Sequence, residues 1–156
     1  EKGGGPSVVN MNAAYEALPA ATRAKIDTMK TANVKISSSR LNTANRDVLA
    51  EQIALGEPPV IHPLVRTHPE RGTKAIWFHT GKTENIEGMD PTETQEFLGN
   101  LLKESAKPEF AYTHEWKLGD LLIVDNRSAL HKAGSDYDMS QHRKLYRTMV
   151  RGDRPY

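Results

Sequence analysis

The sequence has no cysteine among its 156 residues. This absence excludes a disulfide framework, a thiolate metal site and a cysteine nucleophile. Disulfides are rare in the cytosol, because that compartment keeps thiols reduced. The lack of cysteine therefore fits a reducing compartment, and we expect a cytoplasmic protein.

Long apolar runs and an excess of one charge are missing as well. No apolar stretch approaches the length of a transmembrane helix, and the first residues contain no signal-peptide core. Lysine and arginine together number 21, aspartate and glutamate 20, and there is no aromatic-rich basic patch. We therefore expect neither a membrane nor a nucleic acid as partner. The length allows one domain with a sizeable core.

The most informative stretch of the chain is organised around short apolar runs and a polar corner. A turn at Gly119-Asp120 precedes an apolar run from Leu121 to Val124, which has the length of a buried strand. The polar corner Asp125-Asn126-Arg127 follows. A second short apolar run then ends in His131.

A strand-like segment from Arg143 to Arg151 comes after a hydrophilic loop. Side chains alternate between the faces of a strand, so Arg143 and Arg147 share a face with Leu145. Arginine enters an apolar face only where an anion meets it, because an unpaired buried charge is very costly. If a hairpin sets this segment beside His131, the result is a pocket with one imidazole and two guanidinium groups. A structural histidine and arginines paired with surface carboxylates are the alternative.

The remainder of the chain predicts short strands and helices. Pro63 interrupts one strand, which favours an edge or a bulge. Asp90, Pro91 and Glu93 form a capping box that begins a helix. His79 follows a buried strand whose end could reach the pocket, so it is a candidate for substrate contact. The expected strands are 7–10, 60–67, 76–78 and 109–116, and the expected helices are 13–18 with Asn12 as cap, 19–29 and 91–104.

The histidines raise the question of a metal site elsewhere. His68-Pro69-Glu70 formally matches a His-x-Glu metal motif, but Arg71-Gly72 is typical of a hairpin turn and makes His68 a loop residue. We therefore do not expect a metal ligand there. An alternative zinc site would use four histidines: His62, His68, His79 and His114. They lack the close spacing of known zinc motifs.

Several motifs together resemble one known family. They are residues 12–19, 61–69 and 119–127, Leu130-His131, Asp136-Tyr137, Arg143, Arg147 and 151–153. The family is TauD/TfdA, the iron(II)- and 2-oxoglutarate-dependent dioxygenases that include taurine and 2,4-dichlorophenoxyacetate dioxygenases. The resemblance runs from about Gly3 to Pro155 and is weakest over residues 30–58.

The resemblance implies a mainly β fold with flanking helices, a double-stranded β-helix or jelly roll, of which this chain holds a part. In the family, a His-x-Asp motif lies upstream of a Gly-rich stretch like Gly3-Gly4-Gly5. This motif is not among the 156 residues of the sequence. We therefore expect residues 1–156 to be the carboxy-terminal part of a single dioxygenase domain. Such a part needs upstream residues or a partner chain for stability. Residues 30–58 are expected to form a lid or a loop insertion.

The resemblance also assigns roles to individual residues. His131 is the second histidine of a 2-His-1-carboxylate iron(II) site. Arg143 pairs with the distal carboxylate of 2-oxoglutarate through a two-point contact. The family's threonine contact to 2-oxoglutarate falls on Pro6, so Ser7 is the nearest hydroxyl that could replace it. Arg147 would bind the anionic group of the substrate.

Together these roles predict an enzyme that uses O2 and 2-oxoglutarate to hydroxylate a small organic anion, with succinate and CO2 as products. The substrate would be a sulfonate, a sulfate ester or an aryloxyalkanoate, the cofactors are iron(II) and 2-oxoglutarate, and we expect a homo-oligomer. The polar corner 125–127 would fix the strand of His131 by hydrogen bonds. A non-catalytic jelly-roll module that binds anions without iron is the alternative.

Overall fold

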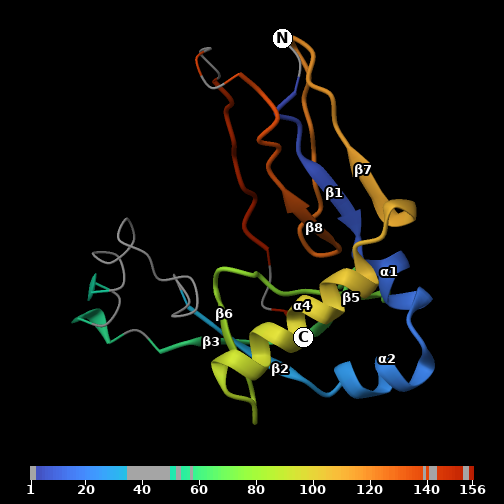
Figure 1. Ribbon diagram of the computed structural model, residues 1–156, viewed down its shortest axis with the longest axis vertical. Helices are drawn as coiled ribbons and strands as arrows, with labels where there is room; N and C mark the ends of the chain where they lie inside the picture. The colour runs from blue at the N-terminus through green and yellow to red at the C-terminus, as the bar shows by residue number, and fades with distance from the viewer. Residues whose placement is uncertain are drawn as a thin grey trace.

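The computed structural model describes residues 3–34, 50–51, 54–56, 58–138, 140, 144–152 and 155–156. Within these residues, strands in three small sheets are combined with a few helices. The molecule consists of an upright arm and a base (Figure 1). In chain order the elements are β1 (Ser7–Asn10), α1 (Met11–Ala17), α2 (Ala20–Ile26), β2 (Lys30–Asn33), β3 (Val60–Pro63), β4 (Val65–Thr67), β5 (Lys74–Ile76), β6 (Thr83–Ile86), α4 (Pro91–Ser105), the 3-10 turn η3 (Pro108–Phe110), β7 (Ala111–Thr113) and β8 (Ala129–Lys132).

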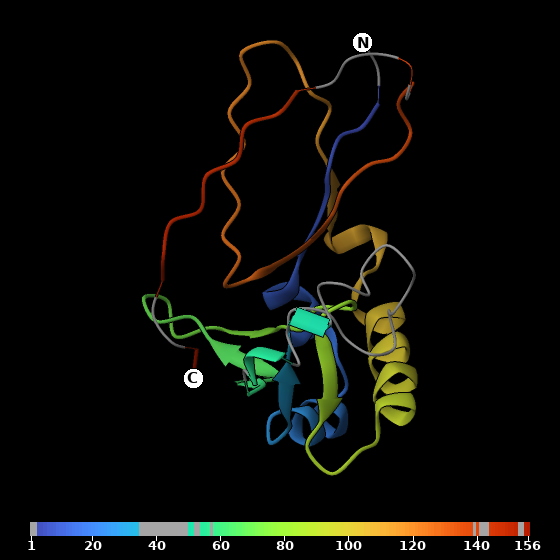
Figure 2. The same cartoon turned by 90° about the vertical axis from the view of Figure 1, so that its left-hand side faces the viewer.

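The arm is built on the antiparallel sheet β7-β1-β8, in which β1 is central. The start of the chain lies at the top of the arm, where the backbone N–H of Gly4 donates a hydrogen bond to Oδ1 of Asp136 (2.8 Å). Residues 144–152 form an extended stretch that Figure 2 shows apart from this sheet. Among the described residues, β8 therefore has a strand partner on one edge only.

The base contains the sheet β3-β2-β6, the hairpin β4-β5 and the helices α1, α2 and α4. Helix α1 packs on β5, and α4 packs on β6. Between these elements lies the hydrophobic core. Its largest fully buried apolar side chains are Met11, Ile26, Leu64, Ile76, Ile86 and Leu98. The base thus has an interior closed by helices. None of the helices in the described ranges is both long and apolar enough to cross a membrane.

Helix α1 corrects one expectation. Its cap is Asn10, whose Oδ1 accepts hydrogen bonds from the backbone N–H groups of Asn12 (3.1 Å) and Ala13 (3.2 Å). Asn12 was the expected cap, but it is buried and its Nδ2 donates to the carbonyl oxygen of Lys74 (2.7 Å) and to Oγ1 of Thr73. Its amide is thus committed to joining α1 to β5. The helix consequently begins at Met11.

The strand expected at 76–78 lies earlier in the chain, as β5 at Lys74–Ile76. Two other local expectations are confirmed. The capping box of α4 is present: Oδ1 of Asp90 accepts from the N–H of Glu93 (2.9 Å), and the Glu93 carboxylate accepts from the N–H of Asp90. The strand expected at 60–67 is interrupted at Leu64, giving β3 and β4. Gly72 lies in the turn between β4 and β5 with a φ of 67°, which glycine adopts without a steric penalty.

Two segments near the carboxy end of the chain, expected to be strands, differ from what the sequence predicts. The run Leu121–Val124 is neither a strand nor buried, since Leu121 and Ile123 are each 84% exposed. The described part of the segment expected at 143–151 forms no ladder with β8. A strand needs a neighbour for its backbone groups and a covered face for its apolar side chains. Among the described residues these two segments have no ladder partner, and their most exposed apolar side chains are not covered.

Two smaller differences concern segments with a polar pattern. The strand expected at 109–116 begins with η3 and is regular only in β7. Lys30–Asn33 lies in the range expected to be a lid, yet it forms β2 at the centre of a sheet. Thr31 and Ala32 are buried there, which a polar sequence pattern does not indicate. Most of the remaining lid range, 35–49, 52–53 and 57, lies outside the described residues, so the lid stays a prediction.

Candidate active site

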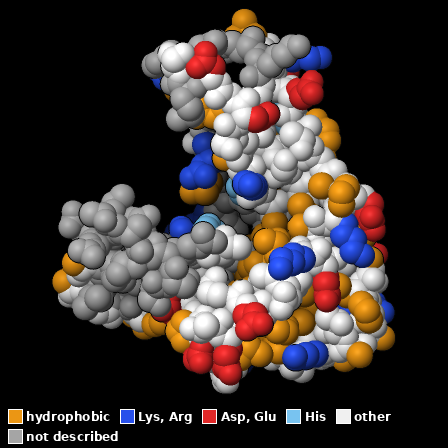
Figure 3. Space-filling view, viewed as in Figure 1, with side chains coloured by type: hydrophobic (Ala, Val, Ile, Leu, Met, Phe, Trp, Pro, Cys, Tyr) orange, Lys and Arg blue, Asp and Glu red, His pale blue; other side chains and the backbone are white. Residues whose placement is uncertain are grey.

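The sheet β7-β1-β8 presents one face to a hollow where the arm meets the base. Directly opposed residues of antiparallel strands place their side chains on the same face. Val8 is opposite both Tyr112 and His131, so these three side chains share a face. Val8, Tyr112 and Ala129 line a hollow of about 290 Å³, together with Leu122. Figure 3 shows Lys, Arg and His side chains gathered around the recess between arm and base.

His131 is the third residue of β8 and is exposed to solvent. Its register with Val8 puts its imidazole on the same face as the walls of the hollow. Ala129, two residues earlier on the same strand, is part of the lining. His131 itself does not line the hollow, so what the strand gives it is a place on the same sheet face.

Ser7 does not join this face. It is the neighbour of Val8 on β1 and pairs with Thr113 and Lys132, so its side chain lies on the opposite side of the sheet. Its Oγ shares a hydrogen bond with Oγ1 of Thr113 (2.7 Å). This arrangement separates the Ser7 hydroxyl from the imidazole of His131.

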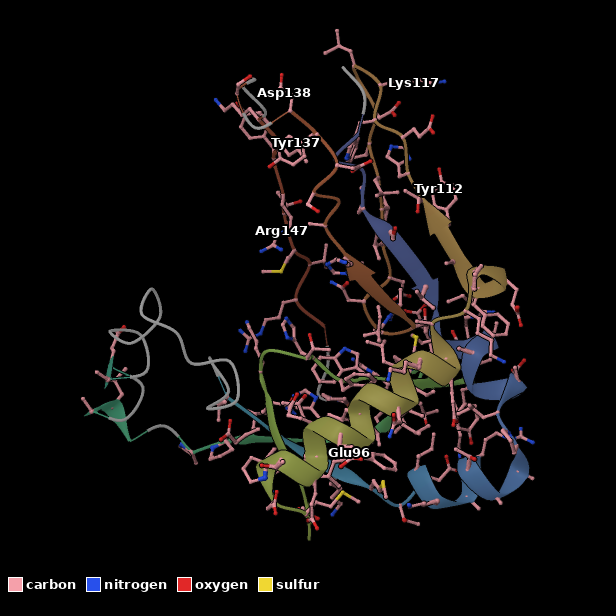
Figure 4. All side chains as sticks on the ribbon, in the orientation of Figure 1. Glu96, Tyr112, Lys117, Tyr137, Asp138 and Arg147 are labelled. Atoms are coloured by element: carbon pink, nitrogen blue, oxygen red, sulfur yellow. The ribbon has the colours of Figure 1, made fainter. Side chains whose placement is uncertain are left out.

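Of the two arginines expected in the pocket, the structure describes only Arg147. Arg143 lies outside the described residues. Arg147 is exposed on the extended stretch 144–152, at about the height of β8 in Figure 4. Because this stretch is not paired with β8, the structure does not bring Arg147 into the sheet that carries His131.

His79 lies in the loop between β5 and β6, in the base. Its N–H donates to Oγ1 of Thr83 (3.1 Å), and its Nδ1 accepts from the N–H of Gly81 (3.0 Å). These bonds stabilise the loop itself. The side chain is exposed, and the described contacts do not connect it with the face of His131.

The polar corner before β8 is held by hydrogen bonds, as the sequence predicts. The Asp125 carboxylate accepts from the backbone N–H of Arg127 (2.9 Å), from its Nε (2.9 Å) and from its Nη2 (2.9 Å). These bonds hold the pKa of the Asp125 carboxyl well below its usual range; burial opposes them, and a bond with His68 adds to them. The same pairing raises the pKa of Arg127.

Sequence reasoning missed the role of His68. It lies in the turn after β4, as expected, but it is only 2% exposed. Its Nε2 is 3.0 Å from Oδ2 of Asp125, 57 residues further along the chain. No local pattern around His68 could reveal a partner at that separation. The strand-like run before it is the one signal that a side chain there could be buried.

Arg66, on β4, was also not singled out. Its Nε is buried without a hydrogen-bond partner. Burial lowers the pKa of its guanidinium, and the Asp125 carboxylate opposes this effect. Arg66 therefore adds positive charge close to the polar corner.

The described residues do not form a metal site of their own. No group of three or more His, Asp or Glu side chains in the described ranges could hold an ion. The zinc alternative fails on the same ground, since its four histidines lie on different elements. His62, for example, stacks on Trp77 with ring centroids 4.8 Å apart. His131 can supply one ligand, and further ligands must come from other residues.

Comparison with known proteins identifies the family. Residues 1–149 match the family described as taurine catabolism dioxygenase TauD, TfdA. The chain is 34% identical, over 97% of its length and 51% of the relative, to the alpha-ketoglutarate-dependent 2,4-dichlorophenoxyacetate dioxygenase of Cupriavidus pinatubonensis. It is 31% identical, over 97% of its length and 53% of the relative, to the (S)-phenoxypropionate/alpha-ketoglutarate-dioxygenase of Sphingobium herbicidovorans.

A solved structure agrees with these relatives. The crystal structure of AAD-2 in complex with Mn(II) and N-oxalylglycine superposes with a TM-score of 0.77 at 33% identity, over 92% of this chain and 55% of that one. The chain belongs to the TauD/TfdA family. It spans about half the length of the curated relatives that it matches.

Proposed function

We propose that this chain carries part of the active site of an iron(II)- and 2-oxoglutarate-dependent dioxygenase that hydroxylates a small organic anion. The observation that carries the proposal is His131, an exposed imidazole on the sheet face that lines the hollow. Family membership supports it, and so do relatives that use alpha-ketoglutarate. It also disfavours the alternative of an anion-binding module without iron.

Three residues of this chain would bind the metal, 2-oxoglutarate and the substrate. His131 supplies one nitrogen ligand through its neutral imidazole, since protonation would remove the lone pair that binds a metal. Arg143 pairs with the distal carboxylate of 2-oxoglutarate, where a planar guanidinium makes two parallel hydrogen bonds. Arg147 binds the anionic group of the substrate. When bound, iron(II) with 2-oxoglutarate supplies the oxidising chemistry that yields hydroxylated product, succinate and CO2.

The hollow bears on the class of substrate. Most of its walls are apolar, among them Val8, Phe110, Tyr112 and Leu122. An apolar wall suits the hydrocarbon or aromatic body of an organic anion, whose charge would pair with Arg147 in the proposed site. The two relatives named above act on aryloxyalkanoates. We therefore propose an aryloxyalkanoate, a sulfonate or a sulfate ester as substrate. The contact of Ser7 with 2-oxoglutarate stays a prediction, and its place on the face of β1 opposite His131 does not support it.

The fold of the whole domain is part of the proposal. We propose that β7-β1-β8 is a fragment of one sheet of a jelly roll, and that residues 121–124 and 144–151 belong to the facing sheet. The exposed apolar side chains of these two segments support this assignment. The missing part of the barrel would come from residues that the relatives have and this chain does not span. A homo-oligomer stays a prediction, which sedimentation of the full-length protein would test.

Anaerobic spectroscopy tests the metal ligand. Iron(II) and 2-oxoglutarate added without oxygen to the full-length protein should produce a visible absorption band. His131→Ala should abolish the band. Lys132→Ala is the matched control, because Lys132 is the exposed neighbour of His131 on the opposite face of β8. Equal bands in both variants would exclude His131 as a ligand.

Titration of the same band tests the two arginines. Arg143→Ala should weaken the binding of 2-oxoglutarate far more than that of the substrate, because it removes a two-point contact with the distal carboxylate. Arg147→Ala should do the reverse. Equal effects of each variant on both ligands would contradict this division of roles.

A further inference from the structure

Four side chains link the turn after β4 to the corner before β8, and we name them the corner ring: His68, Glu70, Asp125 and Arg127. Nε2 of His68 contacts Oδ2 of Asp125 at 3.0 Å. The Arg127 guanidinium donates to the Asp125 carboxylate and, through Nη1, to Oε1 of Glu70 (3.0 Å). The N–H of Glu70 donates back to Nδ1 of His68 (3.3 Å), which closes the ring.

The ring determines which nitrogen of His68 carries the proton. Nδ1 accepts hydrogen bonds from the backbone N–H groups of Glu70 and Arg71, both at 3.3 Å. An accepting nitrogen has no hydrogen, so the proton is on Nε2 and is donated to Asp125. The His68 side chain is 3% exposed, whereas that of Asp125 is 39% exposed. His68 is thus the buried end of this link.

From Asp125 the chain leads directly into β8. The N–H of Ser128 donates to the carbonyl oxygen of Asp125 (3.2 Å), and the N–H of Met11 donates to the carbonyl oxygen of Ser128 (2.9 Å). Ala129 then begins the ladder with β1. Because β8 is four residues long and is paired on one edge in the described structure, this corner is its second restraint.

We infer that His68 is a positioning residue for His131: it holds Asp125, and Asp125 holds the corner from which β8 presents the imidazole. This inference rests on the proposed function only in taking His131 as a metal ligand. The ladder with β1 fixes which residues face each other, and the corner ring fixes where the free edge of β8 lies. Residues that orient metal ligands from a distance influence affinity for the metal.

The members of the ring should not contribute equally. Glu70 is 75% exposed, so its pair with Arg127 is screened by solvent and contributes little. The hydrogen bond of His68 is shielded on one side by the protein and acts on a charged acceptor, which makes it stronger. Glu70→Gln is therefore the control within the same ring.

Three variants separate the contact with Asp125 from the local turn. In His68→Asn, the amide oxygen takes the position of Nδ1 and keeps the bonds from the N–H groups of Glu70 and Arg71, but the side chain is too short to reach Asp125. In His68→Gln, the amide nitrogen can replace Nε2 as donor to Asp125. Asp125→Asn weakens the link from the other end.

Amide hydrogen exchange of the full-length protein, kept free of metal, tests the positioning. In His68→Asn, we expect residues 129–132 to exchange about tenfold faster, the change given by losing roughly one hydrogen bond. The β2-β3 ladder in the base should keep its rates, as should residues 129–132 in Glu70→Gln. Unchanged rates at 129–132 in His68→Asn would overturn the inference. Equal acceleration of both ladders would overturn it too, because His68 would then stabilise the whole fold.

Affinity of the full-length protein for Co(II), followed by its visible absorption, tests the consequence for the ligand. His68→Asn should bind Co(II) about tenfold more weakly, because losing a residue that orients a metal ligand typically weakens metal binding by at least that factor. His68→Gln should recover part of the affinity, and Glu70→Gln should match the unaltered protein. Full affinity in His68→Asn would overturn the inference. Failure of the unaltered protein to bind Co(II) would instead contradict the proposed function, while the exchange result would stand.

Discussion

The base buries large apolar side chains, whereas the arm exposes several of them. In the base, Ile86 and Leu98 are 1% and 2% exposed, enclosed between α4 and the sheet. In the arm, Ile123 is 84% exposed and Val150 is 99% exposed. The difference lies in their neighbours and not in their hydrophobicity, since helices cover the sheet of the base, whereas the described residues leave these outward-facing side chains of the arm uncovered.

This contrast bears on function because the candidate site lies in the arm. Extended exposed apolar surface marks a place where another part of a protein packs. The chain spans about half the length of its curated relatives. In the proposed domain, the residues that these relatives have and this chain does not span would cover the arm. On the proposed function, the arm would supply one side of a site that other residues complete.

The largest expected effect comes from the core of the base. Leu98→Ala removes a fully buried side chain and leaves a cavity, so we expect a loss of about 2–5 kcal/mol in the free energy of unfolding. Ile123→Ala, an arm residue of similar size, should cost under about 0.5 kcal/mol in the same chain. Chemical denaturation measures both. A similar cost for the two variants would remove the distinction between base and arm.

A pair of glycines tests the packing at the top of the arm. A Cβ on Gly5 would lie 1.6 Å from the carbonyl oxygen of His114, a backbone atom that cannot move alone. Gly5→Ala should therefore lower the free energy of unfolding by about 1–3 kcal/mol. Gly99→Ala, in α4 with open space around it, should raise it by about 0.5–1 kcal/mol. A stabilising Gly5→Ala would show that the arm is looser than described.

A smaller effect is expected at the start of α4. Asp90→Ala removes the acceptor for the N–H groups of Thr92 and Glu93 and should cost about 1 kcal/mol in thermal or chemical unfolding. Thr92→Ala, at an exposed position of the same turn, is the control and should cost less. If the two variants were equally stable, the capping box would contribute nothing to the base.

The smallest predicted effect depends on pH and concerns the corner ring. The folded-state pKa of Asp125 is depressed below its ordinary value of 3.8, so its pairing stabilises the folded state above that pH and is lost as the pH falls below it. Asp125→Asn should therefore be less stable near neutral pH, by no more than about 1 kcal/mol because the carboxylate is partly exposed. The difference should shrink in acid. A difference independent of pH would mean that Asp125 acts without its charge.

Local signals in the sequence predicted local structure well. Asp90, Pro91 and Glu93 define the start of α4 within four consecutive residues, and the structure confirms it. Pro63 marked the interruption between β3 and β4. In both cases the residues that determine the structure are adjacent in the chain, so their pattern is sufficient evidence.

Features that depend on distant residues could not be predicted in this way. Leu121–Val124 has the composition of a buried strand, but burial requires a covering partner that the described structure lacks. Asn12 was the predicted cap, but its amide donates instead to the carbonyl oxygen of Lys74, 62 residues away. The contact of His68 with Asp125 was hidden for the same reason. For the site, the motif identified His131, and only the register of β8 showed which face it occupies.

The most direct test of the contrast between arm and base is amide hydrogen exchange at residues 121–124 and 144–150, compared between this chain alone and the full-length protein. The account predicts rapid exchange in the chain alone and strong protection in the full-length protein, with the strands of the base protected in both. Equally rapid exchange in the full-length protein would contradict the claim that other residues cover the arm and complete the site of His131.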